Sequence, residues 1–453
     1  MNRFTVATLL LTAFVSAFPN HATGSASPTV IPAQSETSTR RQDGEWIWMS
    51  KNNGRGIEVK VRGRVEFNEE YTDITDMSHD GLLQVKDSRS GVERRLEITR
   101  SASGGLNRSY QVEGRSRPID REAIEWMTAV IQELVRQGGL DAGKRVRRIY
   151  AERGANGVLD EISQIRSSYV KRLYFEELLQ TGNLDSGAVR RLLDQVARDM
   201  SSSYEKSRVL MKVAGSYLND ETTRSAYLDA VRTIDSNYEK GRVLSALLNK
   251  GDLSKQTLVE AIQAAMNISS SHEKAKMLVQ VAGIYSEDAA MRSAFFDTVE
   301  TIESSYDRRR VLSALLKRSD LSQETLARAF KSVQTMSSDH EKAVILTAAT
   351  ETRLDSGAIP AAFFEAAGTI NSSYDRRRVL SALLKRKNLG KESLLEALKA
   401  ASEISSDHEK ASVLIQVASF ESKDEAVRDA LVNAAKSINS SYERGRVLSA
   451  IFK

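Results

Sequence analysis

One pattern of residues recurs through most of this 453-residue sequence, and it limits the possible folds more than any other feature. Aligning the chain on itself gives nine units, each with a tyrosine or histidine two residues after a serine. The first interval is 35 residues and every later one is 34. The centres are Tyr169, Tyr204, Tyr238, His272, Tyr306, His340, Tyr374, His408 and Tyr442. Repeats of roughly 20 to 50 residues are typical of a solenoid, because each unit buries its apolar face only by stacking on its neighbours.

Each unit carries the pattern of two helices. The serine is a predicted N-cap, and an acidic residue follows it by three positions in every unit but the first, where Val170 stands; this is a capping box. An apolar stripe follows in the 306 unit, formed by Val311, Leu312, Leu315 and Leu316. A second stripe comes later in that unit, formed by Leu326, Phe330, Val333 and Met336. We therefore predict a mainly α fold, a HEAT-like solenoid of α-helical hairpins over residues 166–453.

The N-terminal residues predict export. Arg3 precedes a largely apolar run over residues 4–18, which is too short to cross about 30 Å of hydrocarbon, and small residues follow. We interpret residues 1–24 as a signal peptide and expect a periplasmic or secreted protein; the alternative is an uncleaved anchor. Residues 25–44 are rich in Ser, Thr and Pro, which predicts a flexible linker. No later run reaches about 18 apolar residues, so we expect no transmembrane segment in the mature chain.

Apolar and polar residues alternate over residues 45–117, which predicts an antiparallel β-rich domain with five or six strands. Its turns are expected at 53–54, 90–91 and 101–105. From residue 118 the apolar period becomes 3.6, with Asp120 as a cap. The apolar face of this first helix is Ile124, Met127, Ile131 and Leu134. Two more helices are expected between 142 and 165, so residues 118–165 form connecting helices.

The sequence gives little sign of catalysis. It has no cysteine, which excludes disulfides, thiolate metal sites and cysteine nucleophiles. It has no HExxH, P-loop, Gly-x-Ser-x-Gly or dinucleotide-binding motif, so we expect no enzyme activity, no cofactor and no catalytic site. The histidines at 272, 340 and 408 recur in alternate units; helices packed about 8 to 10 Å apart would separate them by roughly 20 Å, too far to share a metal. One alternative stays open, a hydrolase of an envelope polymer that uses unidentified carboxylates.

A basic residue follows each centre by two positions, and two units extend it to three consecutive arginines. These are Arg308, Arg309 and Arg310, and Arg376, Arg377 and Arg378. In a stack of units they would form a ridge that suits an extended anionic partner. The alternative is a solvated helix face whose charges pair locally. The net charge of +5, from 65 basic and 60 acidic residues, is near balance, so we expect no nucleic-acid partner.

The residues 56–120 include GIEVKVRGRVEFN, GLLQVKDSRSGVERRLEITR and SYQVEGRSRPID, and the first repeat unit contains RSSYVKRLYFEELL. These segments resemble a region of exported bacterial proteins of unknown role. A similar region forms the extracytoplasmic C-terminal end of some membrane metallopeptidases of the antibiotic-sensing antirepressor family. The membrane helices and the HExxH motif of those peptidases are absent from this sequence, so the resemblance implies a sensing or docking role and no proteolysis.

These features together predict a non-catalytic exported scaffold or sensing module. Its expected partner is a protein or an anionic polymer of the cell envelope, bound along the surface of the helical repeats.

Overall fold

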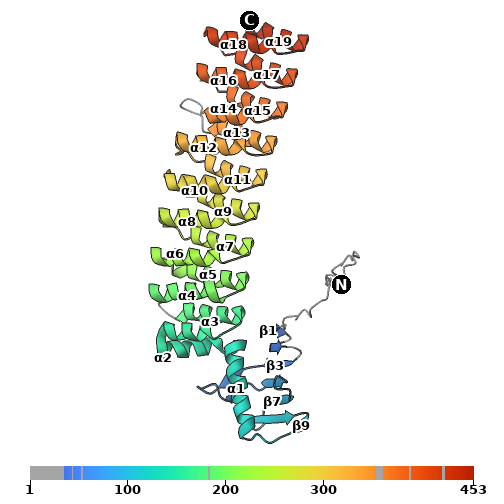
Figure 1. Ribbon diagram of the computed structural model, residues 1–453, viewed down its shortest axis with the longest axis vertical. Coiled ribbons are helices and arrows are strands. Elements are labelled where there is room, and N and C mark those ends of the chain that lie inside the picture. Colours follow the sequence, from blue (N-terminus) through green and yellow to red (C-terminus); the bar gives the residue numbers. More distant parts are fainter. Residues whose placement is uncertain are drawn as a thin grey trace, which may run out of the picture. The chain divides into compact units, whose positions relative to one another are not determined.

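The computed structural model describes residues 35–42, 44–52, 55–181, 184–352, 361–386, 389–420 and 424–452. The chain divides after Thr128 into two compact units. Within the described ranges, nine strands precede nineteen helices (Figure 1). The predicted fold class, a helical-hairpin solenoid after an antiparallel β region, is therefore confirmed. The predicted signal peptide, residues 1–24, lies outside the described residues.

The first unit contains a seven-stranded antiparallel sheet in the order β1-β2-β3-β6-β7-β8-β9, and a separate pair β4-β5. Its strands are β1 (Ser35–Gln42), β2 (Glu45–Asn52), β3 (Arg55–Arg62), β4 (Val65–Phe67), β5 (Ile74–Met77), β6 (Leu82–Asp87), β7 (Arg94–Arg100), β8 (Leu106–Val112) and β9 (Arg115–Ser116). The turns expected at 90–91 and 101–105 join β6 to β7 and β7 to β8; the turn at 53–54 lies outside the described residues.

Strand β1 corrects the linker prediction for its own residues. The predicted linker covered 25–44, but 35–42 pairs along its whole length with β2, in a register that places Thr39 opposite Trp48. Backbone groups make this pairing, so a polar edge strand needs no apolar alternation to form. Sequence periodicity therefore missed it, and it also gave too few strands.

One face of the sheet forms the core of the first unit. Alternate residues of the central strands are fully buried, among them Val59, Leu83 and Ile98. The start of helix α1 (Arg121–Gly138) belongs to this unit, because Trp126 donates a hydrogen bond from Nε1 to Asp87 at 3.1 Å. Asp120 caps α1 as predicted, accepting from the Ala123 amide at 3.0 Å.

The predicted apolar face of α1 is confirmed in three of its four residues. Met127, Ile131 and Leu134 are buried, whereas Ile124 is exposed. The two further helices expected between 142 and 165 correspond to α2 (Ala142–Ser163), which is interrupted at Gly154 by a backbone with φ of 65° and ψ of −167°. A positive φ of this kind suits glycine, which has no Cβ.

Hairpins of helices fill the rest of the second unit, and they stack in two columns (Figure 1). The first helices of the hairpins are α3 (Ser168–Thr181), α5 (Ser203–Ser216), α7 (Asn237–Leu248), α9 (Ser271–Gly283), α11 (Ser305–Leu316), α13 (Asp339–Thr352), α15 (Ser373–Leu384), α17 (Asp407–Ala418) and α19 (Ser441–Ile451). The second helices are α4 (Ser186–Asp199), α6 (Glu221–Arg232), α8 (Lys255–Met266), α10 (Ala289–Glu300), α12 (Gln323–Gln334), α14 (Ala361–Gly368), α16 (Lys391–Ser402) and α18 (Glu425–Lys436). Both predicted apolar stripes of the 306 unit are buried.

The capping serines are confirmed, but the capping box is only half formed. Ser304 Oγ accepts from the Asp307 amide at 3.2 Å, and the equivalent bond forms in the other units. In a full box the acidic side chain would accept from the amide of the capping serine. In the described residues the preceding unit supplies that acceptor instead: the Ser338 amide donates to Ser305 Oγ at 3.3 Å. The acidic side chains are thereby left to pair with arginines of their own helix or of the preceding unit.

Candidate functional site

The basic residue two positions after each centre is a buried structural element. Arg308 is 7% exposed; its Nε and Nη2 donate to the Ile302 carbonyl at 3.1 and 2.6 Å, and its Nη1 donates to Thr335 Oγ1 at 2.7 Å. It therefore ties the loop before its own helix to the end of the following α12. Carbonyls near helix ends lack partners within the helix, so these bonds stabilise the stack. Burial also lowers the pKa of Arg308.

Arg376 has the same role, donating from Nε to the Ile370 carbonyl at 2.8 Å and from Nη2 to Gly368 at 2.7 Å. Lysines replace these arginines in other units. Lys342 donates to the carbonyl and to Oγ1 of Thr369, both at 3.1 Å. The prediction that Arg308 and Arg376 belong to a partner-binding ridge is therefore wrong, because both guanidinium groups are buried and bound to carbonyls.

The other four arginines of the predicted ridge lie at the surface, each in an ion pair. Arg309 pairs with Glu341 of the next unit, and Arg377 pairs with Glu409 in the same way. Arg310 and Arg378 each pair at 2.9 Å with the acidic residue of their own helix, Asp307 and Asp375. The ridge therefore consists of paired charges, and which partner it binds stays a prediction.

An exposed row of tyrosines accompanies these arginines, and we call it the tyrosine ladder. Its side chains all stand two residues after a capping serine, in the first turn of a first helix, and they are 37 to 73% exposed. The ladder comprises Tyr169, Tyr204, Tyr238, Tyr306, Tyr374 and Tyr442. Sequence reasoning treated these residues only as markers of the repeat; their position two residues after an N-cap, outside both apolar stripes, was the available signal for exposure.

Arginines hold several rings of the ladder in place. The guanidinium carbon of Arg309 lies 5.0 Å from the centre of the Tyr306 ring, and that of Arg377 lies 5.1 Å from the centre of the Tyr374 ring. Arg172 is the equivalent arginine for Tyr169, at 5.1 Å. Tyr238 instead has Arg242, four residues after it, at 5.6 Å. A cation over an aromatic face at this distance is attractive, by about 0.5 to 1 kcal/mol at exposed sites. The rings are therefore exposed yet oriented.

Three histidines occupy the remaining places in this row. His408 Nδ1 lies 3.1 Å from Glu443 Oε1, and His272 Nδ1 lies 3.9 Å from Asp307. The hydrogen bond from His408, together with Arg446, lowers the pKa of the Glu443 carboxyl. Within the described ranges, no group of three or more His, Cys, Asp or Glu side chains is arranged to hold a metal ion.

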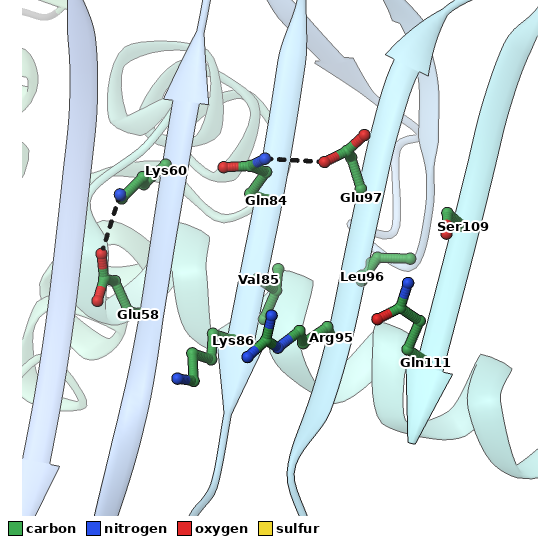
Figure 2. Close-up of a pocket in the computed structure, with 10 residues that line it drawn as sticks. All are labelled: Glu58, Lys60, Gln84, Val85, Lys86, Arg95, Leu96, Glu97, Ser109 and Gln111. Carbon is green, nitrogen blue, oxygen red and sulfur yellow. Dashed lines mark hydrogen bonds and ion pairs between the residues drawn. The ribbon is translucent and has the colours of Figure 1, made fainter. Parts of the chain in front are cut away.

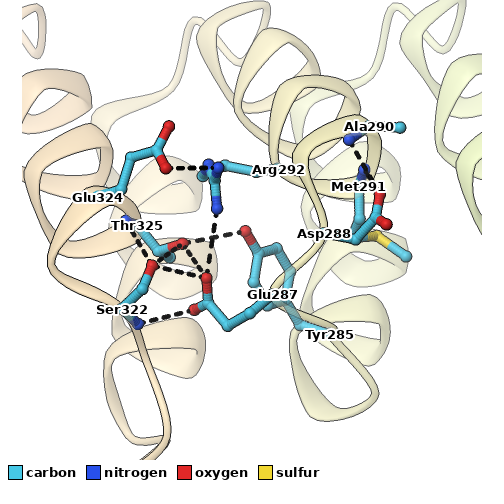
Figure 3. Close-up of polar contacts among 9 residues, drawn as sticks. All are labelled: Tyr285, Glu287, Asp288, Ala290, Met291, Arg292, Ser322, Glu324 and Thr325. Atoms are coloured by element: carbon cyan, nitrogen blue, oxygen red, sulfur yellow. Dashed lines mark hydrogen bonds and ion pairs between the residues drawn. The ribbon is translucent and has the colours of Figure 1, made fainter.

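The opposite ends of the hairpins carry a different polar cluster, shown in Figure 3. Glu287 accepts from the Ser322 amide at 3.0 Å, and from Ser322 Oγ and Thr325 Oγ1 at 2.7 Å. Arg292 pairs with the same carboxylate at 3.4 Å. Burial by itself would raise the pKa of Glu287, but these donors outweigh it and the pKa is lowered. The cluster joins two hairpins, so we assign it to stability.

The open face of the sheet in the first unit has a depression of about 450 Å³ (Figure 2). Its floor is lined by polar side chains of β3, β6, β7 and β8, and several bind one another. Gln84 donates to Glu97 at 2.8 Å, and Lys60 pairs with Glu58 at 3.4 Å. Acidic and basic side chains both line it, so its charge selects no class of ligand.

Carboxyl groups were the possible signature of the hydrolase alternative. Where burial and partners shift a carboxyl pKa in the described residues, they lower it, as at Glu161 and Asp87. For Asp87, burial alone would raise the pKa, but hydrogen bonds from Arg89 and Trp126 outweigh it. A general acid needs a raised pKa, and none of these groups has one.

No protein-family model matches the chain, and no curated protein matches it. The chain is similar to one in a solved structure described as "Computational Design of Self-Assembling Cyclic Protein Homooligomers", with 13% identity over 71% of this chain and 94% of that chain. The TM-score of that match is 0.10. Of the helices in the described ranges, none is long and apolar enough to span a membrane.

Proposed function

We propose that this protein is a non-catalytic scaffold that binds a partner protein along the tyrosine ladder. One observation carries the proposal: six exposed tyrosines occupy the same position in six of the nine hairpins, and most of them contact an arginine. A tyrosine ring that stays exposed does not contribute the free energy that its burial would add to folding. Its repetition at one equivalent position therefore supports a shared role in contact with another molecule.

The surroundings of the ladder support a protein partner. Tyrosine and arginine are among the residues most enriched in binding hot spots, because they combine apolar area with directional hydrogen bonds. The adjoining loops are rich in serine and asparagine, for example 201–203 and 371–373. Tyrosine with serine and asparagine is also the composition of antibody binding loops, where rigid rings supply contact area and small polar groups adapt.

The test compares two double variants of the full-length protein. Tyr306→Ala with Tyr374→Ala removes two neighbouring rings of the ladder. The matched control, Lys331→Ala with Lys399→Ala, removes exposed side chains from the second helices of the same two units. Partners captured from an envelope extract should be lost by the tyrosine variant and retained by the control. Equal capture by both variants would refute the role of the ladder.

We also propose that the protein acts outside the cytoplasm. The apolar run over residues 4–18 supports this, and so does the resemblance to extracytoplasmic regions. N-terminal sequencing of protein from the expressing cells should show a start between Phe18 and Ser27. Mature protein that begins at Met1 would contradict cleavage of a signal peptide.

A further inference from the structure

The two edges of the sheet in the first unit differ in length. Strand β1 is last in the strand order, and within the described residues it pairs only with β2. At the other edge β9 has two residues, and the Arg117 amide donates to the Tyr110 carbonyl at 3.0 Å. These contacts leave residues 106–109 of β8 open on that side, against the eight residues of β1. The long open edge of the sheet is therefore β1.

An open strand edge presents amide and carbonyl groups to which another extended chain can bind. Proteins often block such an edge with proline, lysine or a bulge. Strand β1 has none of these, because its sequence is SETSTRRQ and its residues pair one to one with β2 without a register shift. Its charged residues, Glu36, Arg40 and Arg41, have both signs. They therefore repel a second strand in some registers and attract it in others.

The sequence of β1 is complementary to itself in an antiparallel register centred on Ser38. In that register Ser38 lies opposite Ser38 of a second copy, and Thr37 lies opposite Thr39. Glu36 lies opposite Arg40, so opposite charges meet on both sides of the centre. Cross-strand threonine pairs and pairs of opposite charge stabilise antiparallel strands, whereas like charges directly opposite destabilise them. The register therefore favours a second copy of β1 as the bound strand.

The same register keeps the faces of the two sheets on the same side. Ser38 is opposite Met49, and Met49 is opposite Glu58, which lines the depression on the open face. Residues directly opposite in an antiparallel pair project from one face, so pairing through Ser38 places both depressions on that face. A shift of one residue would turn the second sheet over and set Thr37 opposite Arg40.

We propose that this protein forms a homodimer through β1. Two copies pair antiparallel along β1 about a two-fold axis at Ser38, and their sheets join into one. A two-fold contact of this kind uses the same surface on both copies and therefore closes on itself. No residue of the tyrosine ladder takes part, so the dimer goes beyond the proposed function and does not depend on it.

The mass of the purified full-length protein in solution gives the first test. One chain has a mass of 50.2 kDa, and light scattering after size-exclusion chromatography should show twice that mass at high protein concentration. Wild-type protein that stays monomeric would overturn the dimer. An envelope protein captured by that monomer, and lost on Ser38→Pro, would assign the edge to a different strand.

Charge reversal tests the complementarity of the two strands. Arg40→Glu sets two glutamates opposite each other on both sides of the centre, so we expect the Kd of the dimer to rise about tenfold or more. Arg115→Glu is the matched control, because it makes the same change at an exposed position of the other edge strand, β9. This control should leave the Kd nearly unchanged. Equal dimerisation of the two variants in analytical ultracentrifugation would overturn the pairing of Glu36 with Arg40.

Cysteine cross-linking tests the register, because the sequence contains no cysteine. Directly opposite residues of antiparallel strands have Cα atoms about 4.5 to 5.5 Å apart, within the range of a disulfide. Ser38→Cys should therefore form a disulfide-linked dimer under mild oxidation. Gln42→Cys is the control on the same strand, because its two copies would lie about eight residues apart, or roughly 27 Å.

The outcomes separate the register from the dimer and the dimer from the proposed function. A dimer that cross-links no faster through Ser38→Cys than through Gln42→Cys would overturn the two-fold axis at Ser38. Loss of partner capture by the Tyr306→Ala and Tyr374→Ala variant would bear on the ladder alone, because those residues lie outside β1.

Discussion

The tyrosine and histidine hairpins share their buried frame but differ at their surface. The 306 and 340 units both begin with a capping serine, which an acidic residue follows by three positions. The next residue is a buried basic side chain, Arg308 in one unit and Lys342 in the other. The next two residues diverge: Arg309 and Arg310 in the tyrosine hairpin correspond to Ala343 and Val344 in the histidine hairpin. The frame therefore repeats every 34 residues, whereas from the 238 unit on the residue at the centre, tyrosine or histidine, repeats every 68.

Both ends of the hairpins show this doubled period. At one end, Arg309 of a tyrosine hairpin reaches the acid of the following histidine hairpin. At the other end, Glu287 of a histidine hairpin accepts from Ser322 of the following tyrosine hairpin. Identical stacking demands identical buried residues, whereas alternating contacts leave the exposed positions free to differ. The residues to test for binding are therefore the surface residues that differ between the two kinds of hairpin.

Removing the buried basic side chain should destabilise the packing that the two kinds of hairpin share. Arg308→Ala leaves the Ile302 carbonyl and Thr335 Oγ1 without their donor and opens a cavity, so we expect a loss of about 2 to 3 kcal/mol in the free energy of unfolding. Urea denaturation followed by circular dichroism measures it. Arg308→Lys should cost about 1 kcal/mol or less, because Lys342 fills the equivalent place. A harmless Arg308→Ala would contradict the structural role.

The carboxylate of Glu287 should stabilise the junction in a pH-dependent way. Its folded-state pKa is lowered from 4.5, so its contribution is present above that value and disappears as the pH falls through the folded-state pKa. Glu287→Gln should cost about 1 kcal/mol at neutral pH, after allowance for solvent screening. Thermal unfolding measured from pH 7 to pH 3 should show the two proteins converge. A constant difference would indicate packing instead of charge.

The capping serines should be equivalent in the two kinds of hairpin. Ser304→Ala and Ser338→Ala each remove the acceptor for an amide in the first turn, and each should cost about 1 kcal/mol. Equilibrium denaturation of both variants gives the comparison. Unequal losses would show that the frame is not shared at the caps.

Surface substitutions should separate binding from stability. Arg309→Glu with Arg377→Glu reverses a partly exposed surface charge in each of two tyrosine hairpins, and the losses in affinity for an acidic partner should be nearly additive, because charges beyond about 8 Å are screened at physiological ionic strength. Added salt should weaken the same interaction. Titrations at two salt concentrations check both effects. An affinity that ignores salt and these changes would leave the ridge as a solvated helix face.

The smallest effects are expected for the ladder rings themselves. Tyr306→Ala and His340→Ala should each change the free energy of unfolding by about 0.5 kcal/mol or less, because both side chains are exposed. Thermal unfolding of each variant tests this. A larger loss at Tyr306 alone would show that its contact with Arg309 supports the fold.

The repeat pattern was enough to predict the solenoid, the helix starts and the buried stripes. These features depend on residues close in sequence: Ser304 caps an amide three residues away, and Val311 and Leu315 lie on one face because a helix turns every 3.6 residues. The edge strand β1 was missed, because its pairing with β2 needs no apolar residues. Half of the capping box was wrong, because the preceding unit competes for the serine amide.

The sequence by itself therefore determined the hairpin and its period. Only the tertiary structure decided which charges face water. Arg308, Arg309 and Arg310 are consecutive and chemically identical, yet their environments differ. The first is buried against a backbone carbonyl, and the second forms an ion pair with the next hairpin. The third forms an ion pair with the acidic residue of its own helix and remains partly exposed. Successive residues of a helix point about 100° apart, so each of the three meets different neighbours, and those neighbours come from the preceding loop, the next hairpin and the same helix.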